Sequence, residues 1–353
     1  MDLNNLILFF FLIGFSLFFY KYFLAVLYKY NPKLLIDDQF NKPQAFHESA
    51  ISIAGGLSLF FSLLIIICNF LLFKNIIFFE YLSICTVLFA LGFIDDIRIN
   101  IQPRIRLVLM IIFLIFLIKY NSFYIENTGI EVLNSWLENS EVFSLIFICL
   151  CFLFVINGAN LVDGYNGLLG FHSLIILLNL FFINYLNENN DFANLLFFGI
   201  LILIIFLKYN FPKAKIFLGD GGSYLLGAFV AISVVKTSML NPTISPFYFC
   251  ILLFYLFFEV FFSFFRKLIK EKISPIHPDQ KHLHMLLYKM LLKKNNDKLK
   301  SNYYVSIIMN LIYLTLIIPA IFMMNNGMFC KYYSIVFFIV YIFSYKKIYE
   351  KTK

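Results

Sequence analysis

Charged residues are scarce in this chain, and tryptophan is almost absent. Asp, Glu, Lys and Arg together make up 14% of the 353 residues, and there is 1 Trp. A soluble domain has about 25% charged residues. Here 61% of the residues are hydrophobic, and 48 residues are Phe. This composition excludes a water-soluble globular core, and we expect no nucleic-acid partner.

Cysteine pairs with metal-binding spacing are also missing. The 6 Cys mostly lie in apolar runs and form no C-x-x-C motif, so we expect neither a disulfide framework nor a zinc site. The first apolar run follows Asp2 with no basic residue before it, and no small-residue cleavage site comes after it. We therefore interpret this run as a membrane-spanning helix and not as a cleavable signal peptide.

Apolar runs long enough to cross a bilayer recur along the whole sequence. A spanning helix needs about 20 apolar residues. The predicted fold is an all-α polytopic transmembrane helical bundle of about ten or eleven spans, built as one domain over 1–353. The candidate spans are 3–24, 51–73, 76–94, 106–119, 142–157, 167–186, 192–208, 222–240, 246–265, 303–323 and 332–345. The fourth, fifth and eleventh of these are short.

The distribution of basic residues predicts an orientation. Cytoplasmic loops of membrane proteins are enriched in Lys and Arg. With the N-terminus outside, eleven spans place all but four of the 28 basic residues on the inner side, the exceptions being Lys74, Lys119, Lys236 and Lys331. We therefore expect a multi-pass protein of the inner or plasma membrane with its N-terminus outside.

Polar segments stand at several predicted cytoplasmic helix ends. They are "GFIDD" (92–96), "NGANLVDGYNGLLG" (157–170), "FLGDGGS" (217–223) and "SPIHPDQKHLHMLLYK" (274–289). Carboxylates near the hydrocarbon edge are costly and usually functional. Irregular backbone at that depth survives where it is buried in protein or lines a cavity. Glycine allows close backbone approach, so the acidic turns can converge on a ligand.

Asp and Asn oxygens beside basic residues suit a magnesium–phosphate site. Mg²⁺ usually takes one or two carboxylates and completes its coordination with water and substrate phosphates. The flanking Lys and Arg would hold further phosphate charge. Each segment alone also has a purely structural interpretation: a solvated helix end for Asp95 and Asp96, an Asn-Gly turn, a helix cap at Asp220 or Ser223, or a basic loop on anionic lipid. The combination favours a Mg²⁺–phosphate site in a cleft on the cytoplasmic face, with Mn²⁺ as the alternative ion.

The segments together resemble those of the polyprenyl-phosphate N-acetylhexosamine-1-phosphate transferases, which are glycosyltransferases of family 4. The resemblance covers about 47–284 in the order of the family, and the spans at 303–345 are additional. The matching segments are "HESAISIAGG" (47–56), "GFIDD" (92–96) with Arg106 downstream, "NGANLVDGYNGL" (157–168), "FLGDGGS" (217–223) and "HPDQKHLH" (277–284).

The resemblance implies transfer of a sugar 1-phosphate from a UDP-sugar to undecaprenyl phosphate, with Mg²⁺ and with release of UMP. It implies Asp220 and Asn160 as metal ligands. As catalytic residues it implies Asp95, Asp96, Asp163, His282 and His284. Asp95 and Asp96 would orient the lipid phosphate or accept its proton, and we favour direct attack over a covalent intermediate.

Substrate-binding roles follow from the same resemblance. Phe217 corresponds to the aromatic residue that stacks on uracil, and Asn166 to a nucleotide contact. Glu259 is expected to be an intramembrane partner of a loop residue. The full set of expected substrate-binding residues is His47, Arg106, Asn157, Asn166, Phe217, Gly219, Ser223, Arg266 and Lys281.

Departures from the family pattern bear on the choice of sugar. The third His of an H-x-H-H motif is Met285 here, Ser52 stands near the usual Pro, and the loop after Asp96 is about one residue longer. The consecutive His triplet of the MurNAc-pentapeptide translocase is missing, so a UDP-N-acetylhexosamine such as UDP-GlcNAc is the preferred donor and that translocase is the alternative. The expected pathway is a cell-surface glycan such as lipopolysaccharide O-antigen, and the sequence leaves a homodimer open.

Two other classes remain as alternatives. Polar residues in broken helices are also typical of transporters. However, the polar segments here lie on one face, and the halves of the chain share no matching short segments. A CDP-alcohol phosphotransferase would need D-G-x-x-A-R, whereas the segment after Asp163 reads "GYNGLLG".

Overall fold

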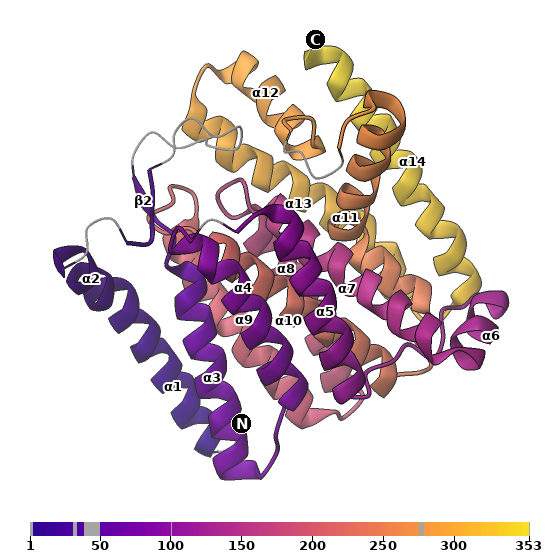
Figure 1. Cartoon of the computed structure of the whole chain (residues 1–353), viewed down its shortest axis with the longest axis horizontal. Helices are drawn as coiled ribbons and strands as arrows, with labels where there is room; N and C mark the ends of the chain where they lie inside the picture. The colour runs from indigo at the N-terminus through magenta and orange to yellow at the C-terminus, as the bar shows by residue number, and fades with distance from the viewer. Residues whose placement is uncertain (1–2, 31–33, 39–49, 100, 275–278, 353) are drawn as a thin grey trace.

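The structure is a computed structural model that describes residues 3–30, 34–38, 50–99, 101–274 and 279–352, and nearly all of its regular structure is helical (Figure 1). The first half contains α1 (Leu3–Phe18), the π-helical segment η1 (Phe19–Phe23), α2 (Leu24–Tyr30), α3 (Gly55–Lys74), the π-helical segment η2 (Tyr81–Cys85), α4 (Thr86–Asp96), α5 (Pro103–Tyr120), α6 (Glu131–Asn139) and α7 (Glu141–Val162). The second half contains α8 (Leu168–Leu186), α9 (Asn190–Asn210), α10 (Gly219–Leu240), α11 (Pro246–Phe265), the π-helical segment η3 (Arg266–Glu271), α12 (Leu283–Asn295), α13 (Lys298–Phe322) and α14 (Gly327–Thr352).

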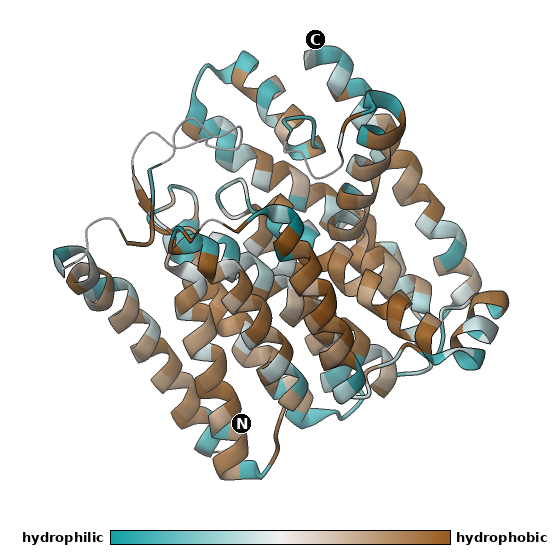
Figure 2. Ribbon diagram, in the orientation of Figure 1, coloured by the Kyte–Doolittle hydropathy of each residue, from teal (hydrophilic) through white to brown (hydrophobic). Residues whose placement is uncertain are grey.

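The helices confirm a polytopic helical bundle. Among the described residues, nine helices are long and apolar enough to cross a membrane. The other two predicted spans are the η2–α4 segment and α5, and α5 carries Arg104, Arg106 and Lys119. Figure 2 shows the hydrophobic residues along the middle of the helices and the hydrophilic ones at their two ends. The protein is therefore a multi-pass membrane protein.

Several helices are longer than the sequence predicted. The fifth span was expected to end at 157, but α7 continues to Val162 and so includes Asn157 and Asn160. Similarly, α5 and α14 extend beyond 106–119 and 332–345. The predicted spans stop where polar residues begin, but the helices continue past them. Packing against neighbouring helices stabilises helical backbone even at residues of low intrinsic helix propensity.

Two short helices were not predicted because neither is long enough to cross a bilayer. The first, α6, lies at the end of the bundle opposite to β2 and α12 (Figure 1). It carries the one Trp of the chain, Trp136, with 57% of its surface exposed. The second, α12, begins directly after His282, at the end where α10 begins. We call this end, where α4 finishes and α10 starts, the motif end, and the other the opposite end.

The helix that positions the motif end is α10. It is the most buried of the candidate spans among the described residues. In its apolar stretch, 78% of the residues are buried inside the protein. It packs against α3, α4, α7 and α8. A carboxylate in its first turn can therefore be reached by residues from several helices at once.

Glycine allows α3 and α10 to meet at their first turns. A Cβ atom added to Gly56 would lie 2.3 Å from the Cα of Gly222, and one added to Gly222 would lie 2.6 Å from the Cα of Gly56. Two helix backbones can approach this closely where both positions lack a side chain. The close backbone approach expected from these motif glycines is thus a contact between helices.

A small antiparallel pair of strands lies beside this contact. It consists of β1 (Ile36–Asp37) and β2 (Ile51–Ser52), with Ile36 opposite Ser52. The amide of Phe217 donates to the Ser52 carbonyl at 2.7 Å, and the Gly55 amide donates to the Phe217 carbonyl at 2.9 Å. The backbone before α10 is therefore fixed on both sides of Phe217.

Candidate active site

Asp220, in the first turn of α10, is where residues from three helices meet. Arg106 of α5 donates from Nη1 to Asp220 Oδ2 at 3.0 Å, and Asn160 of α7 donates from Nδ2 to Asp220 Oδ1 at 2.9 Å. Arg106 also forms an ion pair with Asp95 of α4, and its guanidinium lies 5.5 Å from the ring centre of Tyr224. The sequence predicted Asp95, Arg106, Asn160 and Asp220 as parts of one site, and the structure brings these four together; Tyr224 was not predicted.

Asp96 holds the start of α10 in place. Its Oδ1 accepts from the Asp220 amide at 2.8 Å, and its Oδ2 accepts from the Gly221 amide at 2.9 Å. A carboxylate at a helix N-terminus satisfies unpaired amides and interacts favourably with the helix dipole. Gly219 has φ +75°, and a Cβ there would lie 2.7 Å from Asp96 Oδ2. Asp96 and Gly219 thus orient Asp220, and their predicted roles in catalysis and substrate binding remain predictions.

Asn160 and Ser223 complete the surroundings of Asp220. Asn160 Nδ2 also donates to Ser223 Oγ at 2.9 Å, and Ser223 Oγ donates to the Asp220 carbonyl at 3.1 Å. Because Asn160 uses its amide nitrogen for both contacts, its orientation is set by α10. The extension of α7 beyond 157 is what brings Asn160 to this position.

Asp163 lies in the turn between α7 and α8, close to the other carboxylates. Burial and the negative charges of Asp220 and Asp96 raise the pKa of Asp163 well above its usual range. Four carboxyl groups, those of Asp95, Asp96, Asp163 and Asp220, thus lie near one guanidinium, that of Arg106. A divalent cation would reduce the repulsion among them.

The residues fit Mg²⁺ in the way that this ion binds with a phosphate substrate. Among the described residues, no three His, Cys, Asp or Glu side chains form a complete metal cage. Mg²⁺ does not need one, since it is usually bound by one or two carboxylates together with water and substrate phosphates. Asp220, 38% exposed at its side chain, offers such a carboxylate with Asn160 beside it.

The turn that holds Asp163 is attached to neighbouring helices by asparagines. The Asn166 amide donates to Asn302 Oδ1 at 2.9 Å, and the Gly167 amide donates to Asn210 Oδ1 at 2.6 Å. The side chain of Asn166 is buried and donates to the Pro212 carbonyl at 2.8 Å. Its observed contacts are thus structural, and its predicted contact with a nucleotide remains a prediction.

A second polar cluster surrounds His282 at the start of α12. His282 Nδ1 lies 2.9 Å from Glu259 Oε1, and the Leu283 amide donates to the same oxygen at 3.2 Å. Glu259 is fully buried in α11. The expected pairing of Glu259 with a loop residue is therefore confirmed, and Glu259 itself lies in a candidate membrane span.

His284 is also fully buried, and its environment is less polar. Its Nδ1 lies 2.8 Å from the Tyr255 hydroxyl, and its ring lies parallel to that of His282 with 5.6 Å between centres. Burial lowers the pKa of His284 to about 3, so it is neutral near pH 7. The Tyr165 ring lies 5.7 Å from the His284 ring, which links this cluster to the turn of Asp163.

Arg266 and Lys281 form ion pairs within the same segment. Arg266 donates from Nη2 to Asp279 Oδ2 at 2.7 Å and from Nη1 to Glu271 Oε1 at 2.9 Å. Lys281 Nζ donates to the same Glu271 oxygen at 2.8 Å. Burial alone would raise the pKa of Asp279, but the Arg266 hydrogen bond and the charges of His282 and Lys267 lower it. The substrate-binding roles of Arg266 and Lys281 remain predictions.

The other predicted residues have separate positions. Asn157 donates to the Leu153 carbonyl of its own helix at 2.8 Å, and Phe217 is half-buried at the motif end. His47 lies outside the described residues.

Among the described residues of the second cluster, Tyr255, Glu271, Asp279 and Tyr341 are ones that the sequence did not predict. Asp279 stands inside the "HPDQKHLH" segment and could have been found there. The tyrosines occur in apolar helices, where nothing in the sequence distinguishes a polar contact from packing.

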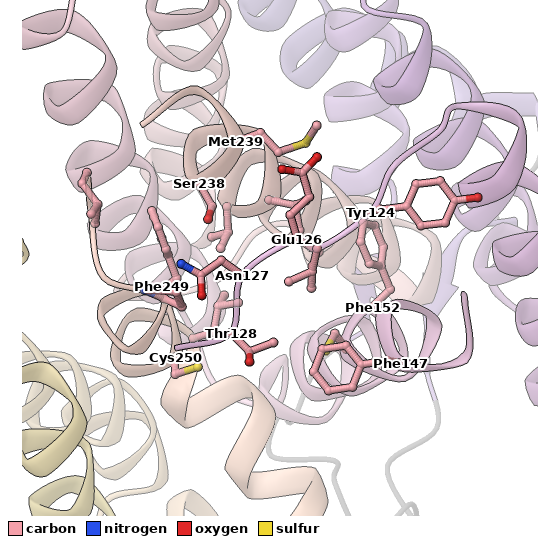
Figure 3. A pocket seen from close by; sticks show the side chains of 18 of the residues that line it. Tyr124, Glu126, Asn127, Thr128, Phe147, Phe152, Ser238, Met239, Phe249 and Cys250 are labelled. Carbon is pink, nitrogen blue, oxygen red and sulfur yellow. The ribbon is translucent and has the colours of Figure 1, made fainter. Parts of the chain in front are cut away.

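A separate cavity of about 250 Å³ lies toward the opposite end, between α7, α10, α11 and the segment before α6 (Figure 3). Figure 3 shows Phe147, Phe152 and Phe249 around it, with Asn127 and Thr128 from that segment. Of its described lining residues, Glu126 is the only charged one. This cavity therefore lacks the groups that a diphosphate requires.

Comparisons with known proteins identify the family of the chain. The model of glycosyl transferase family 4 matches residues 78–238, which include Asp95, Asp163 and Asp220. A phospho-N-acetylmuramoyl-pentapeptide-transferase of Dictyoglomus turgidum is 31% identical over 242 residues, 66% of this chain and 75% of that protein. The chain belongs to the polyprenyl-phosphate hexosamine-1-phosphate transferase family.

Other relatives in this family carry a different name. An undecaprenyl-phosphate alpha-N-acetylglucosaminyl 1-phosphate transferase of Thermotoga maritima is 31% identical over 238 residues, 67% of this chain and 68% of that protein. One of the same name from Escherichia coli K12 is 25% identical over 254 residues, covering 68% and 66%. The family resemblance predicted from the motifs is confirmed, and the protein is a polyprenyl-phosphate sugar-phosphate transferase.

Proposed function

We propose that the protein transfers N-acetylhexosamine 1-phosphate from a UDP-sugar to undecaprenyl phosphate and releases UMP. The observation that carries this proposal is the network of Asp95, Arg106, Asn160 and Asp220, with Asp163 beside it. It combines excess negative charge with a fixed cation at the end of a membrane bundle, where a lipid phosphate and a water-soluble nucleotide can meet. Its products would begin a cell-surface glycan such as O-antigen.

In the proposed reaction, an oxygen of the lipid phosphate attacks the β-phosphorus of the UDP-sugar. The bond from the β-phosphorus to the bridging oxygen breaks, and that oxygen leaves with UMP. The lipid then carries the diphosphate and the sugar. Catalysis of phosphoryl transfer depends chiefly on positioning and on neutralising charge.

Different residues of the site would bind the metal ion, hold the phosphate charge and position Asp220. Asp220 and Asn160 would hold Mg²⁺, which supplies charge neutralisation and Lewis-acid activation when bound. Arg106 is placed to hold phosphate charge, and Asp95 and Asp163 are the carboxylates that would orient the lipid phosphate. Asp96 acts through the backbone of Asp220 and Gly221, since both of its oxygens accept from those amides.

UDP-GlcNAc is the donor that we favour over UDP-MurNAc-pentapeptide. Relatives named for either sugar are equally similar, at 31% identity, so similarity does not choose between them. His282–Met285, which we call the histidine segment, supports the choice, because Leu283 separates His282 from His284 and the next residue is Met285, which is buried. A consecutive His triplet is thus missing from this segment.

The motif end is proposed to face the cytoplasm, with the N-terminus outside. The enrichment of Lys and Arg in loops at this end supports that orientation. UDP-sugars are made in the cytoplasm, so the same orientation gives the donor access to Asp220.

The donor is tested with the purified protein in detergent, undecaprenyl phosphate and Mg²⁺. UMP is measured with UDP-GlcNAc, UDP-GalNAc, UDP-glucose and UDP-MurNAc-pentapeptide in parallel. We expect release with an N-acetylhexosamine and little with UDP-glucose. Release with the pentapeptide donor alone would contradict the proposed sugar while leaving the reaction class intact.

A further inference from the structure

The C-terminal helix α14 reaches the histidine segment through one buried carboxylate. Glu259 Oε1 faces His282 Nδ1 at 2.9 Å and accepts from the Leu283 amide at 3.2 Å. Its other oxygen, Oε2, accepts from the Tyr341 hydroxyl of α14 at 2.8 Å. Glu259 therefore joins α11, α14 and the start of α12 in one contact.

A carboxylate in this position depends on its donors. Glu259 is fully buried and lies in a candidate membrane span. A buried charge is tolerated only where it is paired and hydrogen-bonded. Tyr341 is itself buried, and its ring packs edge-on against Phe258 at 4.8 Å and against Phe262 at 5.2 Å. This packing directs the hydroxyl toward Glu259.

The contact also sets the orientation of His282. With Nδ1 held by Glu259, Nε2 of His282 points to Asp279 Oδ1 at 3.4 Å. A ring nitrogen that is fixed by a carboxylate determines which nitrogen is presented elsewhere. Tyr341 can therefore influence His282 without touching it, by holding Oε2 and so the plane of the Glu259 carboxylate.

We propose that Tyr341 is a positioning residue for His282 and acts through Glu259. The C-terminal helix α14, beyond the segments that resemble the family, thereby becomes part of the active-site support. The kinetic consequence rests on the proposed function, whereas the effect on the histidine segment does not.

The chain offers a matched control on the same helix. Tyr333 of α14 donates its hydroxyl to the Leu316 carbonyl of α13 at 2.9 Å. Tyr333→Phe removes a tyrosine hydrogen bond that also joins α14 to the bundle, but not through Glu259. A merely structural role predicts similar effects of Tyr341→Phe and Tyr333→Phe.

The kinetic test measures UMP release by wild type, Tyr341→Phe, Tyr333→Phe, Glu259→Gln and the Tyr341→Phe/Glu259→Gln double variant. We expect kcat to fall about tenfold in Tyr341→Phe, with little change in KM, and to stay near wild type in Tyr333→Phe. In the Glu259→Gln background, Tyr341→Phe should have no further effect. Equal kcat values in the two Tyr variants, or independent losses in the double variant, would overturn the proposal.

A second test needs neither substrate nor activity. Trypsin cleavage after Lys281 is followed over time in folded, detergent-purified protein. Tyr341→Phe should be cleaved faster than wild type, and Tyr333→Phe at the wild-type rate. Equal cleavage of all three would overturn the positioning role. A silent UMP assay combined with faster cleavage of Tyr341→Phe would contradict the proposed function and keep the inference.

Discussion

At the scale of single residues, Asp220 connects the parts of the site. Its side chain meets Arg106 and Asn160, and its amide donates to Asp96. The sequence placed these residues in four separate segments, and the motifs predicted that they converge. The structure adds that both oxygens of Asp96 accept from the amides of Asp220 and Gly221, whereas the oxygens of Asp220 accept from side chains.

The substitution Asp220→Asn should abolish most of the turnover. It removes the negative charge that would hold Mg²⁺ and face Arg106, so we expect a loss of about a thousandfold in kcat. The control is Asp191→Asn, since Asp191 pairs with Lys74 at 2.7 Å at the opposite end. UMP release from both folded variants provides the measurement, and a near wild-type rate for Asp220→Asn would remove Asp220 from the metal site.

Phe217→Ala should weaken donor binding more than it slows saturated turnover. The backbone at Phe217 is fixed by Ser52 and Gly55, so the substitution leaves the start of α10 in place. Loss of base stacking predicts a rise in KM of about tenfold for the UDP-sugar with kcat changed little. An unchanged KM in steady-state kinetics would exclude the stacking role.

His284 should make the protein less stable in mild acid. Its pKa is about 3 in the folded protein and 6.5 when unperturbed. Between these values the unfolded state binds a proton that the folded state does not, so stability falls as pH decreases through this window and is fully present above it. We expect Tm to fall less from about pH 7 to about pH 4.5 in His284→Gln than in wild type. Parallel Tm curves would contradict the neutral, buried state of His284.

At the scale of helices, hydrophobic runs predicted the existence of the spans but not their ends. The runs predicted α3, α8 and α11 to within a few residues, because these helices are predominantly apolar. They misjudged α7, where Asn160 is helical because its amide is satisfied by Asp220 and Ser223. They missed α12, whose stability comes from burial of Leu283, His284 and Met285 against neighbouring helices. The contacts that stabilise the end of α7 and the start of α12 join residues far apart in the sequence. They therefore produce no hydrophobic periodicity from which these helix ends could be predicted.

The contact of α3 with α10 gives a prediction at this scale. Gly56→Ala would place a methyl group 2.3 Å from Gly222 Cα, which must separate the two helices. We expect a destabilisation of about 1–3 kcal/mol, because inserting a group into a packed contact shifts backbones. UMP release should fall as well, since α10 carries Asp220.

The matched control is Gly14→Ala in α1, where an added Cβ would meet nothing within 4 Å. Alanine is a better helix former than glycine, so this variant should be as stable as wild type or slightly more stable. Thermal unfolding in detergent compares the two variants. Equal Tm values would mean that the α3–α10 contact is looser than the structure shows.

At the scale of the whole molecule, the chemistry is concentrated at one end of the bundle. The acidic turns and the histidine segment lie at the motif end, whereas the cavity near the opposite end is lined mainly by apolar residues. The order of the motifs along the sequence predicted this arrangement, because helices that cross alternately return each motif to the same face. The role of α14 could not be predicted, since Tyr341 stands in an apolar run where a tyrosine usually serves packing.

The central claim is that a phosphorus–oxygen bond of the nucleotide sugar is broken at the motif end. The most direct measurement identifies the nucleotide and the lipid formed from undecaprenyl phosphate and a UDP-N-acetylhexosamine, by chromatography and mass spectrometry. The account predicts UMP in equal amount to a polyprenyl-diphosphate sugar, dependent on both lipid and Mg²⁺. Release of UDP together with a lipid monophosphate sugar would mean that the sugar–oxygen bond is broken instead, and would contradict the account.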